Sequence, residues 1–457
     1  MSCTRNEEAF AWEKCLVHNL RNTNRDIKLN MESPLNVLII GSGGREHALL
    51  KACLNSPLVE KAWAAPGNGG MAEETDCHPL DVENPEACVQ LAKDLGANLV
   101  IVGPEVPLAL GVADDLREAG IPTYGPGSDG AVLESSKAAC KAFFKKYDIP
   151  TADWNTFTET APALEYLNQF DLPVVVKASG LAAGKGVLIC ETKEDAEAAV
   201  RGMLDDGTFG ESGQEVVIEE FLTGQEASIM VMVSGNKYVC LAPSQDHKRV
   251  GEGDTGLNTG GMGAYAPAAV VNESIMEIVH KDIIGPTLEG FEAEGIDFRG
   301  TLFIGLMISD AGEPKVLEYN VRFGDPECQV LLPLCETDPV QLIRDCANGT
   351  LEPEEVKMKD QAAMIVVLAA DGYPGSYPKN DLIKLPESLP EGLSIVHAGT
   401  RLDESGQLRS SGGRVLGVVS MAETLEQAAE KAYAVCDAVE WENKYFRRDI
   451  GHRQLKS

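Results

Sequence analysis

Residues 174–187 read VVVKASGLAAGKGV, in which a run of valines ends at Lys177 and a loop of small residues leads into a second apolar stretch. This pattern predicts two short strands joined by a glycine-rich loop, whose backbone amides can close over a triphosphate while Lys177 supplies the countercharge. A Walker A loop would need glycine at 179 and serine or threonine at 186, but the chain has Ser179 and Gly186. The stretch is therefore typical of a glycine flap rather than a P-loop, and an ordinary glycine hairpin is the alternative.

A second strand with a polar end follows in residues 216–228, VVIEEFLTGQEAS. The strand ends at residues 219–222, where free backbone groups beside apolar side chains can pair with an adenine ring. Glu226 comes four residues later, and its carboxylate can accept hydrogen bonds from both ribose hydroxyls. Taken singly, each acid is better explained as a solvated surface residue, but their spacing after the glycine flap favours a nucleotide site.

Residues 315–329, KVLEYNVRFGDPECQ, place two oxygen donors on one face of a predicted strand. Glu318 and Asn320 share a face because side chains alternate along a strand, and two hard oxygen ligands suit Mg²⁺. Arg322 continues that face and offers a bidentate fork for a carboxylate or a phosphate. The alternative is an edge strand with wet polar residues, against which the sharp turn predicted at residues 324–326 counts.

A second glycine cluster lies in residues 37–49, VLIIGSGGREHAL, where a strand feeds into Gly41, Gly43 and Gly44 and then into a helix. The amides at such a helix start can hold an anion. A dinucleotide fingerprint would need glycine in place of Glu46, and the next strand ends in Pro-Gly-Asn at 66–68 rather than in an acid. NAD is therefore disfavoured, and a plain tight turn is the alternative.

Composition excludes several classes of protein. With 39 basic and 71 acidic residues among 457, the net charge of −32 disfavours binding to nucleic acid or anionic lipid. The longest apolar run, residues 362–370, is far shorter than the roughly 20 residues that span a bilayer. The 12 cysteines show no C-x-x-C pair, so disulfides and zinc clusters are not expected, and none of the seven histidines has metal spacing, His247 being the least certain. A soluble cytoplasmic protein in a reducing compartment is expected.

Alternating strand and helix patterns from Asn36 onward predict an α/β fold with an N-terminal βαβ parallel sheet, a central domain with a small lid, and a C-terminal α+β cap. Residues 244–267 hold six glycines without a periodic apolar face and are expected to form a structureless active-site loop. The predicted strands cover 37–40, 59–64, 99–102, 173–177, 187–190, 302–308, 315–319, 362–370 and 415–420, and the predicted helices cover 46–54, 84–95, 193–204, 273–294 and 425–435. The predicted domains are a disordered extension over 1–33, an N-terminal domain over 34–136, a central domain over 137–355 with its lid at about 155–225, and a cap over 356–457.

In this order the motifs resemble one enzyme family. The glycine turn, the GLAAGKGV flap, the EEFL-x-G-x-E hinge, SQDHKR with NTGGMGAY, and RFGDPE-x-Q together are similar to the phosphoribosylamine-glycine ligases, also called glycinamide ribonucleotide synthetases, of the ATP-grasp superfamily. The matching motifs run from about Val37 to Ile450. The flap and the hinge are shared with other ATP-grasp ligases, whereas the last two motifs are more specific.

The resemblance implies a central ATP-grasp domain, and ATP with Mg²⁺ or Mn²⁺ as cofactors. It implies roles for individual residues, with Asp246 and Arg322 clamping glycine and Glu318 and Asn320 holding the metal. The implied ATP ligands are Lys137, Lys177, Gly184, Lys185, Gly186, Glu219, Phe221, Leu222 and Glu226, and the implied phosphoribosylamine ligands are Gly41, Gly43, Gly44, Arg45, Asn68, Glu105 and Arg414.

The implied reaction is the ATP-dependent ligation of glycine to 5-phosphoribosylamine through glycyl phosphate, the second step of de novo purine biosynthesis. No nucleic-acid or membrane partner is expected, and the protein is expected to be a monofunctional monomer or weak dimer. One alternative is another ATP-grasp ligase, of the carboxylase or dipeptide type, which the RFGDPE-x-Q signature disfavours. Another is a non-catalytic nucleotide sensor, which would lack the metal and clamp residues that are present here.

Overall fold

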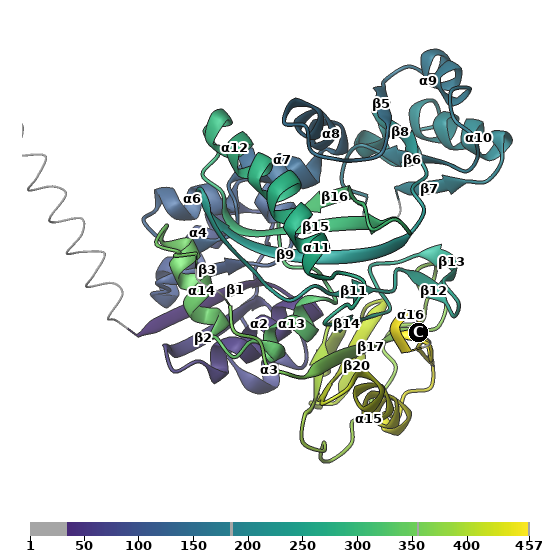
Figure 1. Ribbon diagram of the computed structural model, residues 1–457. Helices are drawn as coiled ribbons and strands as arrows, with labels where there is room; N and C mark the ends of the chain where they lie inside the picture. The colour runs from purple at the N-terminus through teal and green to yellow at the C-terminus, as the bar shows by residue number, and fades with distance from the viewer. Residues whose placement is uncertain (1–33, 183–185, 354–355, 456–457) are drawn as a thin grey trace, which may run out of the picture.

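The N-terminal part of the computed structural model is built on a four-stranded parallel sheet in the order β2-β1-β3-β4 (Figure 1). The structure describes residues 34–182, 186–353 and 356–455, so the predicted extension over 1–33 lies outside the described residues, as do Gly184 and Lys185. The elements are β1 (Leu35–Gly41), α2 (Gly44–Asn55), β2 (Val59–Pro66), α3 (Met71–Glu74), α4 (Pro85–Leu95), β3 (Leu99–Val102), α5 (Glu105–Ala109), α6 (Val112–Glu118), β4 (Thr123–Tyr124) and α7 (Ser128–Ser135). The predicted parallel βαβ arrangement is confirmed.

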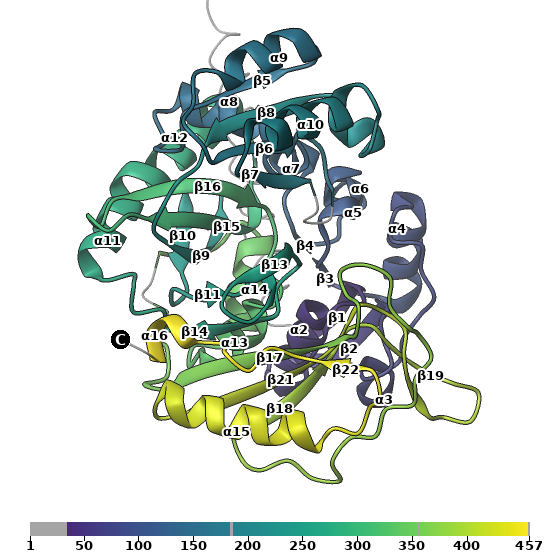
Figure 2. The same cartoon turned by 90° about the vertical axis from the view of Figure 1, so that its right-hand side faces the viewer.

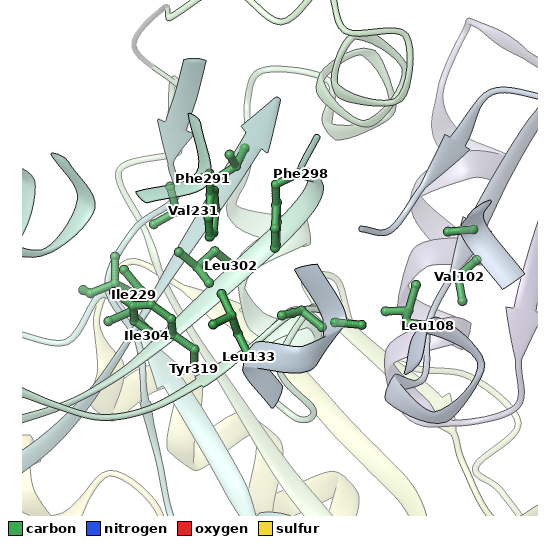
Figure 3. Packing of buried hydrophobic residues seen from close by; sticks show 14 of the residues in the cluster. Val102, Leu108, Leu133, Ile229, Val231, Phe291, Phe298, Leu302, Ile304 and Tyr319 are labelled. Carbon is green, nitrogen blue, oxygen red and sulfur yellow. The ribbon is translucent and has the colours of Figure 1, made fainter. Parts of the chain in front are cut away.

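A four-stranded antiparallel sheet, β10-β9-β15-β16, forms the centre of the molecule. Its elements are α8 (Lys137–Lys146), β9 (Gln225–Ser234), β10 (Lys237–Cys240), α11 (Glu273–Ile278), α12 (Gly285–Glu294), β15 (Arg299–Ile308), β16 (Pro314–Asn320), α13 (Cys328–Leu334) and α14 (Pro339–Ala347). Strands β9 and β15 pair along ten residues each, and their apolar side chains share one core with the N-terminal sheet. In Figure 3, Leu133 lies beside the central residues Leu302 and Ile304, while Val102 and Leu108 of the N-terminal part lie at the other end of the same cluster.

The helix predicted over 273–294 is present but interrupted. A π-helical turn at Val279–Ile284 separates α11 from α12. Pro286 stands in the first turn of α12 and has no backbone N–H to continue the regular hydrogen-bond ladder, which accounts for the wider turn before it. Near the end of α12, Phe291 stacks on Phe298 with ring centroids 5.0 Å apart. The helix is thereby fixed to the central core, as Figure 3 shows.

The lid is a separate antiparallel sheet, β5-β8-β6-β7, which stands away from the rest of the molecule in Figures 1 and 2. Its elements are β5 (Trp154–Phe157), α9 (Thr160–Leu167), β6 (Val174–Ala178), β7 (Val187–Cys190), α10 (Lys193–Leu204), a 3₁₀ turn at Gly210–Gly213, and β8 (Val216–Glu220). The lid buries a core of its own under α9 and α10. Because few of its apolar contacts are shared with the central sheet, the lid can move as a unit.

The C-terminal part is a sheet in the order β11-β14-β17-β21-β18, with β22 also on β17 and helix α15 packed against it. The elements are β11 (Gln245–Asp246), β12 (Arg249–Gly251), β13 (Thr255–Asn258), β14 (Gly263–Ala266), β17 (Ala362–Ala370), β18 (Leu393–His397), β19 (Thr400–Leu402), β20 (Leu408–Ser410), β21 (Arg414–Ala422), α15 (Leu425–Ala438), β22 (Lys444–Tyr445) and α16 (His452–Leu455). The predicted α+β cap is confirmed.

The prediction that residues 244–267 are structureless is wrong. Their two ends form β11 and β14, which continue the C-terminal sheet through β17, and their middle forms the β12–β13 hairpin. Strand β14 consists mostly of glycine and alanine, so it has no run of large apolar side chains to reveal it. Small residues are required there, because a Cβ on Gly263 would lie 2.6 Å from the carbonyl oxygen of Ile365.

Two buried histidines join the N-terminal and C-terminal parts. The N–H of His397 donates to His47 Nδ1 at 2.8 Å, and His47 Nε2 lies 3.2 Å from a carboxylate oxygen of Glu74. Asn68 Nδ2 donates to the carbonyls of His397 at 2.8 Å and Ser42 at 2.9 Å. The glycine turn after β1 is thereby bound to the end of β18.

This contact predicts acid sensitivity. Burial, together with the charges of His47 and Lys51, lowers the pKa of His397 to about 3. As pH falls, the unfolded chain takes up the proton near pH 6.5 while folded His397 stays neutral, so stability is lost below that pH. Between about pH 7.5 and 5.5 the loss from this group is on the order of 1 kcal/mol. Urea unfolding at both pH values should show a smaller pH dependence for His397→Gln than for the parent; equal dependences would contradict the prediction.

Within the described residues, the helices include none whose length and apolar content would let it traverse a lipid bilayer.

Candidate active site

Two lysines share one buried carboxylate where the lid meets helix α8. Lys177 of β6 forms an ion pair with Glu219 of the neighbouring strand β8, and Lys141 Nζ lies 2.6 Å from the other carboxylate oxygen of Glu219. Burial opposes the charge of Glu219, but Lys177 and Lys141 outweigh it and lower the pKa of that carboxyl. Burial also lowers the pKa of Lys141. The acid therefore holds both lysines in place.

Lys137 stands one turn before Lys141 at the start of α8, so both side chains leave the same face of the helix. Its Nζ donates to the carbonyl of Gly180 at 3.1 Å, at the root of the glycine flap. Lys141 was not predicted as a site residue, although its spacing of four from Lys137 is a signal that could have found it. Lys137, Lys141 and Lys177 are called the lysine cluster below.

The hinge between lid and central sheet carries the residues expected to face a nucleobase. Phe221 and Leu222 follow the end of β8 and are partly exposed, while Glu226 lies near the start of β9. A carboxylate oxygen of Glu226 is 3.1 Å from Lys248 Nζ. Lys248 belongs to the SQDHKR motif but was not singled out, because a lone lysine in a loop has no spacing that distinguishes it.

Glu318 and Asn320 lie at the end of β16, as predicted, beside the lysine cluster. Glu318 Oε1 is 3.7 Å from Lys248 Nζ, and its side chain is 33% exposed. Burial opposes ionisation, but Lys248, Lys177 and Lys137 outweigh it and lower the pKa of Glu318 to about 2. The carboxylate is therefore charged at neutral pH and partly open to solvent.

These two oxygen donors fit Mg²⁺, but only together with phosphates. A carboxylate and an amide oxygen are hard ligands of the kind that Mg²⁺ combines with substrate oxygens. The surrounding lysines would repel a bare divalent cation, whereas they attract a polyphosphate that carries one. No group of three or more His, Cys, Asp or Glu side chains in the described part of the chain is arranged to hold a metal alone.

Arg322 lies just beyond β16 and is held by acids. Its Nη2 is 2.8 Å from Glu134 and 3.0 Å from Asn320 Oδ1, and its Nε is 3.6 Å from Glu105. Glu134 is itself buried and accepts from the N–H of Val321 at 2.7 Å. Arg322 Nε is buried and makes no hydrogen bond within the described residues, so Glu105 interacts with it only as an ionic partner.

Asp246 is buried on β11, and within the described residues it forms no hydrogen bond or ion pair with Arg322. Burial raises the pKa of Asp246 to about 7, with Lys248 opposing and Glu327 adding to the effect. Glu327 is also buried, accepts from Ser228 Oγ at 3.1 Å, and feels the charge of Arg322. The Glu327 carboxylate therefore interacts electrostatically with both Asp246 and Arg322, the two residues predicted to clamp glycine.

The glycine turn after β1 surrounds a carboxylate of the protein itself. The N–H of Gly43 donates to Glu46 Oε2 at 2.6 Å, and Glu46 Oε1 accepts from Arg45 Nε at 2.5 Å. A Cβ on Gly41 or Gly103 would overlap the Glu46 side chain. The glycine that a dinucleotide fingerprint would have at 46 is thus replaced by an internal anion, which fits the exclusion of NAD. Gly43 N–H is already engaged, so an external phosphate would need the other groups of this turn.

A cavity about the size of one water molecule lies between Arg45 and Arg322. It is lined by Arg45, Gly103, Tyr124, Arg322 and Phe323, among others. Arg45 Nη1 also donates to the Phe323 carbonyl at 3.1 Å, which fixes the guanidinium at the cavity wall. Two arginines from different parts of the chain thus face one space.

Arg414 of the C-terminal part binds two loops, at Gly260 and at Asp325, to the start of β21. Its Nη1 donates to the carbonyls of Gly260 at 2.5 Å and Asp325 at 2.7 Å, and its Nη2 to Asp325 Oδ2 at 2.9 Å. Asp325 Oδ1 accepts from Gln329 at 2.6 Å. A Cβ on Gly44 would lie 2.8 Å from the Gln329 amide, so the glycine turn closes onto the same point.

Comparison with known families agrees with this arrangement. Models of phosphoribosylglycinamide synthetase match three successive parts of the chain, namely the N domain at 35–134, the ATP-grasp domain at 135–328 and the C domain at 363–453. The chain belongs to the phosphoribosylglycinamide synthetase family. The resemblance expected from the motifs is thereby confirmed.

Relatives in this synthetase family align over nearly their whole length. A phosphoribosylamine–glycine ligase of Agrobacterium fabrum is 48% identical over 422 residues, covering 92% of this chain and 99% of the relative. One of Haemophilus influenzae is 47% identical over 425 residues, with the same coverage. The crystal structure of the Thermotoga maritima ligase superposes with a TM-score of 0.79 at 36% identity, covering 91% of this chain and all of that one.

A more distant neighbour shares the fold alone. The biotin carboxylase domain of a Hydrogenobacter thermophilus 2-oxoglutarate carboxylase, solved with MgADP and bicarbonate, has a TM-score of 0.73 at 16% identity, covering 91% of this chain and 92% of that one.

Proposed function

We propose that this chain ligates glycine to 5-phosphoribosylamine, forming glycinamide ribonucleotide, ADP and phosphate through glycyl phosphate, as the second step of de novo purine biosynthesis. Membership of the synthetase family supports the reaction. The observation that carries the assignment in the molecule itself is the placement of the lysine cluster, Glu318 and Arg322 around one junction of lid, central sheet and N-terminal turn.

ATP is assigned to the space between lid and central sheet, with its phosphates on the lysine cluster. The partly exposed Phe221 and Leu222 suit the adenine, and Glu226 suits the ribose. Glu219 supports the site by holding Lys177 and Lys141, not by facing the nucleotide with free oxygens. The flap residues Gly184 and Lys185 are proposed from the sequence motif, with Gly186 at the flap's end accepting from the N–H of Ala178 at 2.8 Å.

Glu318 and Asn320 would hold Mg²⁺, with Mn²⁺ as a substitute. The bound metal would neutralise phosphate charge and so reduce repulsion between ATP and the carboxylate of glycine. The more distant MgADP complex of the biotin carboxylase neighbour supports nucleotide and Mg²⁺ use in this fold.

The substrates are assigned to the opposite side of the lysine cluster. Arg322, whose Nε makes no hydrogen bond within the described residues, is proposed to bind the glycine carboxylate, and Asp246 to accept from the amine. Phosphoribosylamine is proposed to bind at the glycine turn Gly41, Gly43 and Gly44, with Arg45, Asn68 and Glu105 as further ligands and Arg414 on the C-terminal side.

No protein nucleophile is needed for this reaction. Phosphorylation turns the carboxylate into a good electrophile, and the amine of phosphoribosylamine then displaces phosphate. The protein contributes by holding the reactants in line and offsetting their like charges, and oriented reactants are worth up to about 7 to 11 kcal/mol. We propose that the enzyme works in the cytoplasm as a monomer or weak dimer.

An oxygen-label experiment tests the chemistry. With glycine carrying ¹⁸O in its carboxylate, one labelled oxygen is expected in the released phosphate and the other in glycinamide ribonucleotide, because the carboxylate oxygen attacks the γ-phosphorus of ATP. Mass spectrometry of both products checks this, with glycine, phosphoribosylamine or both omitted as controls. Unlabelled phosphate, or ADP release that depends on bicarbonate instead of glycine, would contradict the proposal.

A further inference from the structure

Residues shortly before the end of the described chain lie against the loop that carries Asp246 and Lys248. Residues 445–455, called the C-terminal strap, pass beside residues 246–259, called the Asp246 loop. In both Figure 1 and Figure 2, helix α16 of the strap lies next to β14 and close to the β12–β13 hairpin. The strap contains none of the residues assigned to ATP, and its contacts are with the Asp246 loop.

Contacts from the strap fall on consecutive residues of the loop. They are Arg453 Nη1 to Asp246 O at 3.2 Å, Gly451 N–H to His247 Nε2 at 3.1 Å, Arg447 Nη1 to Arg249 O at 3.0 Å, and Tyr445 Oη to Val250 O at 2.8 Å. The carbonyl of the remaining residue, Lys248, accepts from the N–H and the hydroxyl of Thr259, both at 2.8 Å. Every residue from 246 to 250 is thus held.

Asp254, at the tip of the loop, is the main anchor. Its carboxylate lies 3.0 Å from Arg447 Nη1, 2.8 Å from Arg453 Nη2 and 3.3 Å from His452 Nε2. Asp254 has a φ of +56°, an uncommon conformation for a residue other than glycine. Arg447 is completely buried, and Asp449 completes its coordination at 2.7 and 2.8 Å. The ion pair between Asp254 and Arg447 thus joins a residue with left-handed backbone to a buried arginine.

The loop is also held by main-chain pairing, with Asp246 and His247 on β14 and Gly263 and with Lys248 on Thr259. Beyond Lys248, the β12–β13 hairpin pairs Arg249 with Asn258 and Gly251 with Thr255, so the strap contacts add most at this end of the loop. The loop positions Lys248, whose Nζ lies 3.1 Å from Glu226 and 3.7 Å from Glu318. A small displacement of this backbone would therefore move Lys248 relative to both acids.

We propose that the C-terminal strap positions the Asp246 loop for the ligase reaction, and that Arg447 and Arg453 are positioning residues that act through Asp254 and main-chain carbonyls. This inference rests on the proposed function. It makes the end of the C-terminal part a determinant of the geometry between ATP and the carboxylate to be phosphorylated.

The variant Arg453→Met tests this, with Arg448→Met as its matched control. Arg448 is 57% exposed and pairs through its side chain with the exposed Asp437 instead of the loop. Arg453→Met should lower kcat on the order of 10- to 100-fold, since misplacement by about 1 Å costs that much. Its KM for ATP should change less than kcat, because Phe221 and Leu222, the residues assigned to adenine, are not part of the Asp246 loop. The control should keep the parental kcat.

Coupling and exchange separate positioning from general weakening. Arg453→Met combined with Asp254→Asn should lower kcat by less than the product of the two single effects, because the Arg453–Asp254 pair is lost in both single variants. Arg453→Lys, which keeps a donor and the charge, should recover part of kcat. Amide hydrogen exchange across 246–259 should be faster in Arg453→Met than in Arg448→Met. If Arg453→Met does not fold, Tyr445→Phe, which removes only the hydroxyl on Val250, replaces it.

Equal kcat and equal exchange in Arg453→Met and Arg448→Met would overturn the proposed strap. Failure of the proposed function gives a different result, because the unmodified enzyme would then show no ADP release that depends on glycine and phosphoribosylamine. In that case, amide hydrogen exchange in Arg453→Met and Arg448→Met still tests whether the strap holds the loop in place.

Discussion

Glu318→Gln should lower the rate of glycinamide ribonucleotide formation by about 10²- to 10³-fold while leaving the fold intact. The substitution keeps the size of the side chain but removes the charge that offsets Lys248 and the lysine cluster around the phosphates. Because the carboxylate is one-third exposed, no buried apolar contact is lost. ADP release measured over a Mg²⁺ titration should show a higher Mg²⁺ requirement together with the lower maximal rate.

The matched control is Glu313→Gln, an exposed acid just before β16. It should keep the parental rate and the parental melting temperature. A Glu318→Gln enzyme with near-parental turnover at saturating Mg²⁺ would remove Glu318 from the proposed metal site. A melting temperature far below that of the parent would instead make the residue structural.

Glu219→Gln is expected to have the largest effect on stability. The carboxylate compensates two buried ammonium groups, and removing one partner of a buried ion pair typically costs about 3 to 5 kcal/mol. Unfolding of the lid in urea, followed through the fluorescence of Trp154, which pairs with Glu219 across β5 and β8, measures this loss. The KM for ATP should rise as well, because Lys177 is no longer held in place.

The adjacent Glu220→Gln serves as the control. Glu220 is 41% exposed and lies 3.6 Å from the equally exposed Lys315, so its loss should change the free energy of unfolding by less than about 0.5 kcal/mol. Similar losses for Glu219→Gln and Glu220→Gln would show that the buried lysines do not depend on their shared acid.

Strands made of large apolar residues could be predicted closely. Leu99–Val102 and Ala362–Ala370 have the predicted bounds, because each is a continuous buried run that only a covered strand explains. Strand β14 could not be predicted in this way, because the sheet leaves no room for a side chain at Gly263 and the strand therefore lacks a run of large apolar residues. Its partner β17 is about a hundred residues further on, and nothing local indicates that pairing.

The site residues likewise divide into those that local sequence patterns predict and those that they do not. Glu318 and Asn320 could be placed on one face because strand periodicity is local, and the structure has them at the end of β16. The environment of Arg322 could not be predicted, because Glu134 reaches it from a distant helix. Glu46 was used only as evidence against a dinucleotide, although the glycines around it imply a side chain that fills the turn.

The pairing of β14 with β17 has a consequence during synthesis on the ribosome. At about 5 to 20 residues per second, β14 emerges several seconds or more before its partner exists. Throughout that interval a strand edge of the nascent chain stands open, and open edges are the places where other chains attach. Slow elongation between the codons for residues 266 and 362 would lengthen this exposure, so yield in a heterologous host should depend on codon choice in that interval more than elsewhere.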